Sequence, residues 1–399
     1  MQTCHLCQSQ NVVEQVDFGM QPVCNRYLTH STDNEYTHPL VLVQCQTCGL
    51  VQLQNPLPPG EIKPRYDWIT YNEPEGHLDK LVEIIVNLPG ITPNSSIGSL
   101  SFKDDSTLQR LNKLGFKQTW RLDSQKDLNI HDPRASIETI RDIFKPPIIA
   151  KIINSYGQPD IVIARHIIEH GNNIIGFLKA LKQLIKPNGY IVIEVPDSVQ
   201  FLENHDCSPI WEEHIVYFTP ETFKNSFSIG HFSLVKFENF PYALENSLIG
   251  IAQPTDIDES SLTTTKLEEE ISRSLFYAQG VLKRNNALRQ TLFEYQQKHG
   301  KIALFGAGHV GCMFINLVGL TDIIEFVVDD DPHKKNLLMP GSQLPIYESC
   351  ALLDKNIKLC LLTLSPESEK KVLENNQAFI KKGGTFASIF LGDKLALNL

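Results

Sequence analysis

Four cysteines near the start of the chain have the spacing of a metal site. Cys4 and Cys7 form one Cys-x-x-Cys pair, and Cys45 and Cys48 form a second. Four thiolates arranged in this way are the ligand set of a closed, tetrahedral zinc site. Two disulfides are the alternative, but the chain opens with MQTCHLC, without the basic and apolar stretches of a signal peptide. Because four sulfurs leave zinc no open position, we expect this metal to stabilise structure while the chemistry lies elsewhere.

A second candidate site follows the segment SSIGSL, which reads as a short buried strand entering a turn. Gly98 and Ser99 lie where the first strand of a doubly wound sheet would end, and Asp123 lies where a carboxylate could accept hydrogen bonds from a ribose. The loop between them has one glycine where such loops usually have two or three. An ordinary strand-to-helix turn is therefore an open alternative at this point.

A third candidate site lies near residue 306. Gly306, Gly308 and Gly311 form GxGxxG directly after the apolar run KIALF, and Asp329 follows at the distance that a dinucleotide fingerprint requires. Taken alone, this pattern favours NAD.

The elements that must position these residues alternate between strands and helices. Residues 77–88 and Ile174–Ile185 have helical periodicity, while Asp160–Ala164 and Gly189–Val195 are apolar runs typical of buried strands. Residues 261–298 predict a long helix or helix pair. This alternation predicts an α/β protein with parallel sheets covered by helices.

The expected domain boundaries follow from these patterns. They are a zinc-binding module over residues 1–60, a first α/β lobe over 61–258, a helical connector over 259–299 and a second α/β lobe over 300–399.

Composition excludes several classes of protein. The chain has 399 residues, 36 Lys and Arg against 46 Asp and Glu, and a formal charge of −10. Without a basic block, a nucleic-acid partner is not expected, and without a long apolar run, neither is a membrane span. Five scattered cysteines outside the predicted zinc site suggest reduced thiols in a cytoplasm. The oligomeric state cannot be read from the sequence.

Several blocks resemble known proteins. RHIIEH at 165–170 and KPNGYIVIEVPD at 186–197 resemble the "HVLEH" and "LKPGG…IEVPD" blocks of class I S-adenosylmethionine-dependent methyltransferases. IWEEHIVYFTPETF at 210–223 is similar to the "YHEHFSYFS" signature of the sugar C-methyltransferase family, and QPVCNRY is similar to its "QPLAN" block. The segment RYDWITY matches the aromatic "YPYHSS" segment of that family, and FGAGHVGCMFIN matches its "GAPAKGNTLLN". The chain is thereby identified as resembling this family over nearly its whole length.

The resemblance implies a class I methyltransferase lobe followed by a second Rossmann-like lobe, with zinc and S-adenosylmethionine bound. It further implies action on a nucleotide-linked keto-deoxysugar, with deprotonation beside the ketone and methyl transfer to the resulting enolate. Its site residues carry over as His214 for the base, Glu213 for its acidic neighbour, and Tyr66 and Tyr217 for the sugar pocket. Those expected near the cofactor are Gly98, Ser99, Asp123 and His166. Histidine suits the role of base because its ordinary pKa is about 6.5.

The chain also departs from the family. IGSLSFKDDSTLQRL replaces "DIGSNDGTLL", with Ser106 where the second glycine would fall, and a bulkier loop could obstruct the methionine end of the cofactor. Trp68 and Trp211 replace tyrosines, and His166 replaces the asparagine of "NVLAH". Two alternatives therefore remain open. One is a degenerate lobe that binds a sugar nucleotide without methyl transfer, and the other is an NAD-linked oxidoreductase that uses the GxGxxG.

Overall fold

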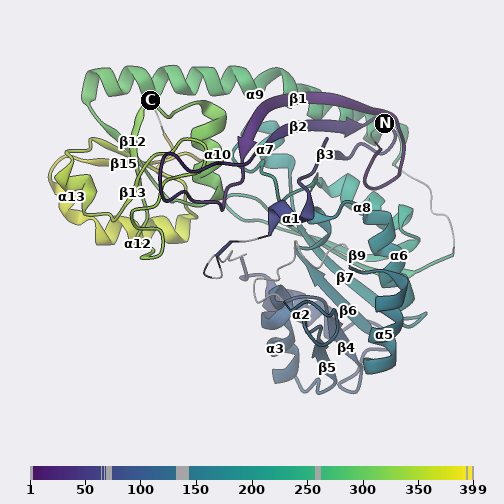
Figure 1. Ribbon diagram of the computed structural model, residues 1–399. Helices are drawn as coiled ribbons and strands as arrows, with labels where there is room; N and C mark the ends of the chain where they lie inside the picture. Colours follow the sequence, from purple (N-terminus) through teal and green to yellow (C-terminus); the bar gives the residue numbers. More distant parts are fainter. Residues whose placement is uncertain are drawn as a thin grey trace.

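The computed structural model contains three sheets connected by one long helix (Figure 1). The described residues are 3–63, 65–66, 68, 74–131, 143–256, 262–391 and 394–397. Most of the aromatic segment RYDWITY lies outside the described residues; Arg65, Tyr66 and Trp68 lie within them.

The central lobe is built on a six-stranded sheet in the order β5-β4-β6-β7-β10-β9. The first four strands are parallel, β10 is antiparallel to β7, and β9 is antiparallel to β10, so β9 runs in the same direction as the first four. The strand bounds are β4 Ile97–Ser99, β5 Thr119–Arg121, β6 Ile161–Arg165, β7 Tyr190–Pro196, β9 Phe232–Phe240 and β10 Ser247–Pro254. The order of connections reverses between β4 and β6, which is where ligands bind in sheets of this type.

Helices cover both faces of this sheet. Side chains alternate along β7, so that Tyr190 and Val192 pack with helices α2 and α3 while Ile191 and Ile193 pack with α5, α6 and α8. Both faces are thus buried, as the continuous apolar run of this strand predicts. The helix bounds are α2 Leu78–Val86, α3 Asp105–Lys113, α5 Pro146–Tyr156, α6 Ile174–Leu184, α7 Val199–Glu203 and α8 Pro220–Ile229, with short 3-10 turns η1 at Phe102–Asp104 and η2 at Ile168–His170.

The N-terminal module is an antiparallel sheet in the order β1-β2-β3-β8. Its first three strands are β1 Val12–Pro22, β2 Thr37–Cys45 and β3 Val51–Leu53, followed by the short helix α1 Pro59–Ile62. The fourth strand, β8 Val216–Tyr217, comes from the central lobe. The module therefore shares a sheet with the segment that directly follows His214.

The C-terminal lobe is a parallel sheet in the order β13-β12-β11-β14-β15. Helix α9, Thr264–His299, leads into it and packs on β1, α7 and α10, so it contacts all three parts of the chain (Figure 1). The side chain of Thr263 caps the start of α9, and Gly300 ends it. The other bounds are β11 Ile302–Phe305, α10 His309–Val318, β12 Ile324–Val328, β13 Ile346–Tyr347, α11 Ala351–Asp354, β14 Leu359–Leu362, α12 Pro366–Asn375, α13 Gln377–Lys381 and β15 Thr385–Ser388.

The predicted α/β class is confirmed by this architecture. Within the described ranges, none of the helices combines the length and the apolar character needed to cross a bilayer.

The structure gives Gly98 a packing role. It lies inside β4, where an added Cβ would come within 2.4 Å of the Trp120 ring. That indole stacks on Tyr156 of α5, with ring centroids 4.6 Å apart. Glycine at this position therefore leaves room for a neighbouring aromatic side chain.

We predict that Gly98→Ala lowers the free energy of unfolding by about 1–3 kcal/mol, because overpacking forces side chains out of their preferred rotamers. Chemical unfolding in the absence of any ligand measures this loss. Gly60→Ala is the matched control, since Gly60 is exposed in α1 and has no atom within 4 Å of the added methyl group. Equal stability of the two variants would contradict the packing role.

Candidate active site and zinc centre

The four predicted zinc ligands lie together. The Sγ atoms of Cys4 and Cys48 are 3.6 Å apart, as are those of Cys7 and Cys45. Four sulfurs at about 2.3 Å from one tetrahedral zinc ion would be separated by about 3.8 Å, so the cluster fits the metal. All nine cysteines are free, so the two-disulfide alternative is not what the structure contains.

The loop after β4 is organised without a second glycine. Ser101 and Asp104 form a capping box, and Asp104 Oδ2 accepts hydrogen bonds from the backbone N–H groups of Leu100 at 3.1 Å and Ser101 at 3.2 Å. Ser106 lies inside α3, where its hydroxyl donates to Glu75. The extra residues of this loop thus form a helical turn, and side chains of the loop itself accept hydrogen bonds from its backbone N–H groups.

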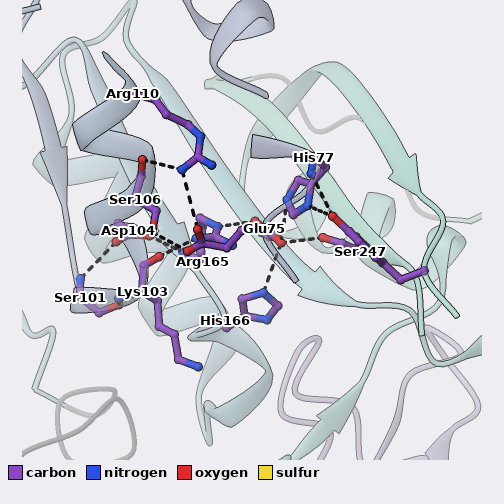
Figure 2. Close-up of polar contacts among 12 residues, drawn as sticks. Glu75, His77, Ser101, Lys103, Asp104, Ser106, Arg110, Arg165, His166 and Ser247 are labelled. Carbon is purple, nitrogen blue, oxygen red and sulfur yellow. Dashed lines mark hydrogen bonds and ion pairs between the residues drawn. The ribbon is translucent and has the colours of Figure 1, made fainter. Parts of the chain in front are cut away.

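A buried network of charges lies beside this loop, at the carboxyl ends of the central strands (Figure 2). Arg165, at the end of β6, donates from Nε to Glu194 Oε2 at 2.5 Å and from its backbone N–H to Asp104 Oδ1 at 3.1 Å. The other oxygen of Glu194 accepts from Ser247 at 2.7 Å and lies 3.0 Å from His77 Nε2 and 3.2 Å from His166 Nε2. The network connects β6, β7, β10, the β4 loop and the residue before α2.

Two opposing effects set the protonation of these carboxyl groups. Burial would raise the pKa of Glu194, but the contacts with His166, His77 and Arg165 outweigh burial and hold its pKa well below the usual range. Burial is the larger effect for Asp104 and raises its pKa to about 7, although the charge of Arg165 acts in the opposite direction. Glu194 is therefore the permanent anion of the network.

The residues predicted to lie near the cofactor surround this edge. Ser99 ends β4 and is fully buried, and its hydroxyl has no hydrogen-bond partner. Asp123 lies on the loop after β5, where its Oδ1 accepts from the backbone N–H groups of Gln125 and Lys126. His166 follows β6 in the left-handed region, with φ of 51°, and faces Glu194. Ser99 and His166 thus end the two strands between which the connections reverse.

The segment around His214 is attached to the N-terminal module by hydrogen bonds. Glu212 accepts from the Cys24 backbone N–H at 2.6 Å, and Glu213 Oε1 accepts from Asn25 Nδ2 at 2.9 Å. Strand β8 then pairs with β3. The two sequence blocks that resemble the family most closely, QPVCN and WEEH, are therefore in direct contact.

His214 lies among aromatic rings and a second histidine. Its ring centroid is 4.9 Å from that of His170 and 5.3 Å from that of Trp211, which in turn stacks on His309 of α10 at 4.1 Å. The hydroxyl of Tyr217 is buried and bonds the backbone of Trp211. His214 therefore lies where the central lobe, through His170, and the C-terminal lobe, through His309, approach one another.

Tyr66 lies in a different environment. Its ring is 4.9 Å from Trp68 and 6.3 Å from Tyr27, and its hydroxyl donates to Tyr27 O at 3.4 Å. Trp68 also stacks on His333, at 5.3 Å. Tyr66 thus belongs to an aromatic cluster on the C-terminal lobe, and its role in a sugar pocket stays a prediction.

The loop that contains the C-terminal GxGxxG motif makes close contacts within its own lobe. Asp329 Oδ2 accepts from the Ala307 backbone N–H at 2.9 Å and from Lys334 Nζ at 2.9 Å. An added Cβ on Gly306 would meet the Thr363 hydroxyl, and one on Gly311 would meet the Gly306 carbonyl. The acid expected to bind a ribose instead holds the loop, and both glycines are explained by packing.

Sequence reasoning missed Arg165, Glu194, His77, Asp104 and Glu169 as members of the site. The sequence did contain a signal for Arg165 and Glu194. Glu194 interrupts the apolar run YIVIEV, and Arg165 directly follows the apolar strand DIVIA. A charged residue within or at the end of a buried strand requires a partner, and here each supplies the other.

Three family models match successive parts of the chain. A zinc binding domain matches residues 4–62, a methyltransferase domain matches 122–229, and a C-methyltransferase C-terminal domain matches 264–390. The C-methyltransferase NovU from Streptomyces niveus is 23% identical over 397 residues, which cover 96% of this chain and 94% of NovU.

Solved structures give a weaker likeness. The CcbJ methyltransferase from Streptomyces caelestis is 12% identical with a TM-score of 0.31, covering 48% of this chain and 94% of that one. The 1,6-didemethyltoxoflavin-N1-methyltransferase from Burkholderia thailandensis is 14% identical with a TM-score of 0.29, covering 46% of this chain and 80% of that one. TM-scores of this size do not establish a common fold.

The succession of domains defines the class of protein. The chain is a methyltransferase enzyme that carries a zinc-binding module ahead of its methyltransferase domain. It is similar to the C-methyltransferases with this three-part arrangement, and its methyl donor is S-adenosylmethionine.

The central sheet has polar groups that fit such a cofactor. The Ser99 hydroxyl and Arg165 Nη2 are buried without hydrogen-bond partners at the ends of β4 and β6. Unsatisfied buried polar atoms are rare in folded proteins, and a polar ligand at this edge would satisfy them.

We predict one zinc ion per chain, lost in Cys45→Ser. Because the free energy of binding structural zinc is about 10 kcal/mol or more, the N-terminal module should unfold with the metal and release β8. Elemental analysis measures the metal, and limited proteolysis near residues 210–217 measures the release. Cys350→Ser, which removes an exposed thiol, should retain both zinc and protease resistance. Full zinc content in Cys45→Ser would refute the assignment.

We also predict that Arg165→Met lowers the free energy of unfolding by about 3–5 kcal/mol, because Glu194 would remain charged and buried without its partner. Urea unfolding followed by circular dichroism measures the change. Arg289→Met is the control, since Arg289 forms an ion pair with Asp322 on the surface through two hydrogen bonds. Its loss should be below about 1 kcal/mol. Similar losses in both variants would show that the buried network does not contribute to stability as described.

Proposed function

We propose that this C-methyltransferase acts on a nucleotide-linked keto-deoxysugar and that His214 removes a proton from the carbon beside the ketone. The observation that carries the proposal is the position of His214 between the central and C-terminal lobes, on a segment held by the zinc module. A sugar substrate is further supported by the resemblance of residues 210–223 to the signature of sugar C-methyltransferases.

The chemistry of the proposed substrate requires a base. A carbon beside a ketone becomes nucleophilic only after it loses a proton, so a base must lie within reach of that hydrogen. His214 is half-buried and can reach a ligand, whereas His170 is buried and its Nδ1 is bonded to Glu213 O at 2.8 Å. His214 is thus the better candidate for the base.

The surrounding side chains orient this base. Glu213 is held by Asn25, and Tyr217 supports the backbone of Trp211 through its hydroxyl. We assign both to positioning the segment, while Tyr66 contributes to the sugar pocket from the aromatic cluster.

The cofactor supplies an electrophilic methyl group when bound. Ser99, Asp123 and His166, with Gly98 beneath Trp120, lie on strands or loops at the edge where it would bind. These residues would hold it, and alignment of donor and acceptor would contribute much of the rate.

The other two hypotheses lack a specific supporting observation. The fingerprint acid Asp329 is bonded within its own lobe, and that lobe matches a C-methyltransferase domain. A degenerate lobe without methyl transfer predicts that S-adenosylmethionine does not bind, which the following experiment tests.

We predict that His214→Gln keeps the affinity for S-adenosylmethionine and lowers turnover of a keto-deoxysugar nucleotide by two to four orders of magnitude, the range for loss of a general base. Calorimetric titration measures the affinity, and mass spectrometry of the methylated product measures turnover. His38→Gln, which changes a histidine on the N-terminal module, is the control for a general effect of the substitution. Wild-type turnover in His214→Gln would remove His214 from the mechanism, and no cofactor binding by the wild type would favour the degenerate alternative.

A further inference from the structure

Glu169 is a buried carboxylate with almost no compensation. It lies in η2, directly after the strand that carries the charge network, and its side chain is 1% exposed. Among the residues that the structure describes, neither carboxylate oxygen has a hydrogen-bond partner. His166 Nδ1 lies 3.3 Å from Oε1 but outside hydrogen-bonding geometry. A carboxylate in such a position is costly to ionise unless a cation lies beside it.

Two imidazoles border this carboxylate. A ring nitrogen of His170, one of His214 and an oxygen of Glu169 all lie within 4.8 Å of one another. His170 Nδ1 must donate to the carbonyl of Glu213, because a carbonyl oxygen only accepts. The orientation and tautomer of the His170 ring are thereby fixed. His214 is the more exposed of the two rings and is the one that can meet a substrate.

The backbone fixes the same arrangement. The Ile215 N–H donates to Glu169 O at 2.9 Å, so the residue after His214 is bonded to η2. Strand β8 begins one residue later and pairs with β3. The distance between Glu169 and His214 is therefore set by two rigid attachments rather than by the side chains alone.

We propose that Glu169 is a positioning residue for His214, whose carboxylate stabilises the imidazolium formed when His214 takes the substrate proton; this inference rests on the proposed function. In that step the C–H bond breaks, its proton bonds to a ring nitrogen of His214, and its electron pair remains on the substrate as the enolate. The enolate pair then forms the new bond to the methyl carbon, while the pair of the sulfur–methyl bond stays on sulfur. The new positive charge of His214 thus forms next to an existing buried negative charge.

Other charged groups face the same pair and limit the effect. His170 lies beside both residues on η2, and His166 faces Glu169 from the end of β6. Glu213 precedes His214 in its own segment, Tyr217 faces it from β8, and His309 lies behind Trp211 on α10. Within this group, Glu169 is the acid whose oxygens are both buried without hydrogen bonds, so its charge is the least screened.

The same three side chains are also a donor set for a divalent metal ion. Their ligand atoms lie within 4.8 Å of one another, a limit that the four sulfurs of the zinc cluster also meet. This spacing suits a proton acceptor and its carboxylate as well as it suits metal ligands. Metal binding is therefore an outcome that the test must distinguish.

The test compares the pKa of His214 in the wild type and in Glu169→Gln. We expect the loss of the carboxylate to lower this pKa by about one to three units, the usual effect of removing an opposite charge at 4–6 Å. NMR titration of histidine-labelled zinc-loaded protein measures it, with His214→Gln to assign the signal. Because the base must be unprotonated, the acid limb of the kcat/KM profile should shift to lower pH by the same amount, and the plateau should fall as the base weakens. Glu325→Gln removes a carboxylate of the C-terminal lobe and should change neither value.

Each outcome has a defined meaning. An unchanged pKa of His214 in Glu169→Gln would overturn the inference, and so would a second equivalent of divalent metal per chain that is lost in this variant. If Glu169→Gln does not fold, Glu169→Asp retains the charge, and a wild-type pKa of His214 in that variant would support the inference while a lowered one would refute it. The NMR measurement needs no substrate, so a wild type that fails to methylate keto-sugar nucleotides would end the proposed function while the Glu169–His214 coupling is still measured.

Discussion

The pairing of β3 with β8 is the interaction on which the rest of the site depends. Val51 and Gln52 of the N-terminal module pair with Tyr217 and Val216 of the central lobe. This short ladder connects four thiols at one end of a sheet to the segment that holds His214. The cores merge in the same way, since Cys4, Cys45 and Cys48 pack in one cluster with Ile215, Val216 and Phe218. The zinc site can therefore determine the position of His214, although His214 is not one of its ligands.

The charge network holds polar groups in place at the edge of an apolar sheet. Arg165, Glu194 and Asp104 are each at most 1% exposed, a placement that is favourable only when every charge has a partner. Their contacts cross from β6 to β7 and to the β4 loop, so they fix the relative positions of three strand ends. The left-handed backbone of His166, at a cost of about 1–3 kcal/mol, is held in place by the same contacts.

The sequence predicted the parts of the fold that have strong local patterns. The buried runs at DIVIA and GYIVIEV became β6 and β7, and the long helix became α9 within a few residues of its expected bounds. Strand β8 has two residues and exists because β3 offers it a partner, so no periodicity could reveal it. The hairpin of β9 and β10, which are antiparallel to each other, was also missed, although both strands are long.

Prediction of the site was limited for a similar reason. Cys4, Cys7, Cys45 and Cys48 were found because metal geometry imposes a spacing on the sequence itself. Glu169 and His214 are brought together by a backbone hydrogen bond between segments far apart in the chain, which leaves no trace in either segment. Gly98 was predicted to lie near a cofactor, which stays a prediction, and its surroundings add a neighbouring indole that also requires glycine.

The N-terminal module also depends on parts of the chain that are synthesised much later than the module itself. Its fourth strand lies near residue 216, and the hydroxyl of Tyr27 bonds the carbonyl of Ala307, 280 residues further along. On the ribosome, the edge of β3 therefore stays unpaired until β8 has been synthesised. The hydroxyl of Tyr27 lacks this hydrogen bond until Ala307 has been synthesised. Contacts this distant in sequence slow folding and leave strand edges exposed to wrong partners. If the four thiols bind zinc early, the metal would close the loop between them during that interval. Zinc would then stabilise the module before the later lobes have been synthesised.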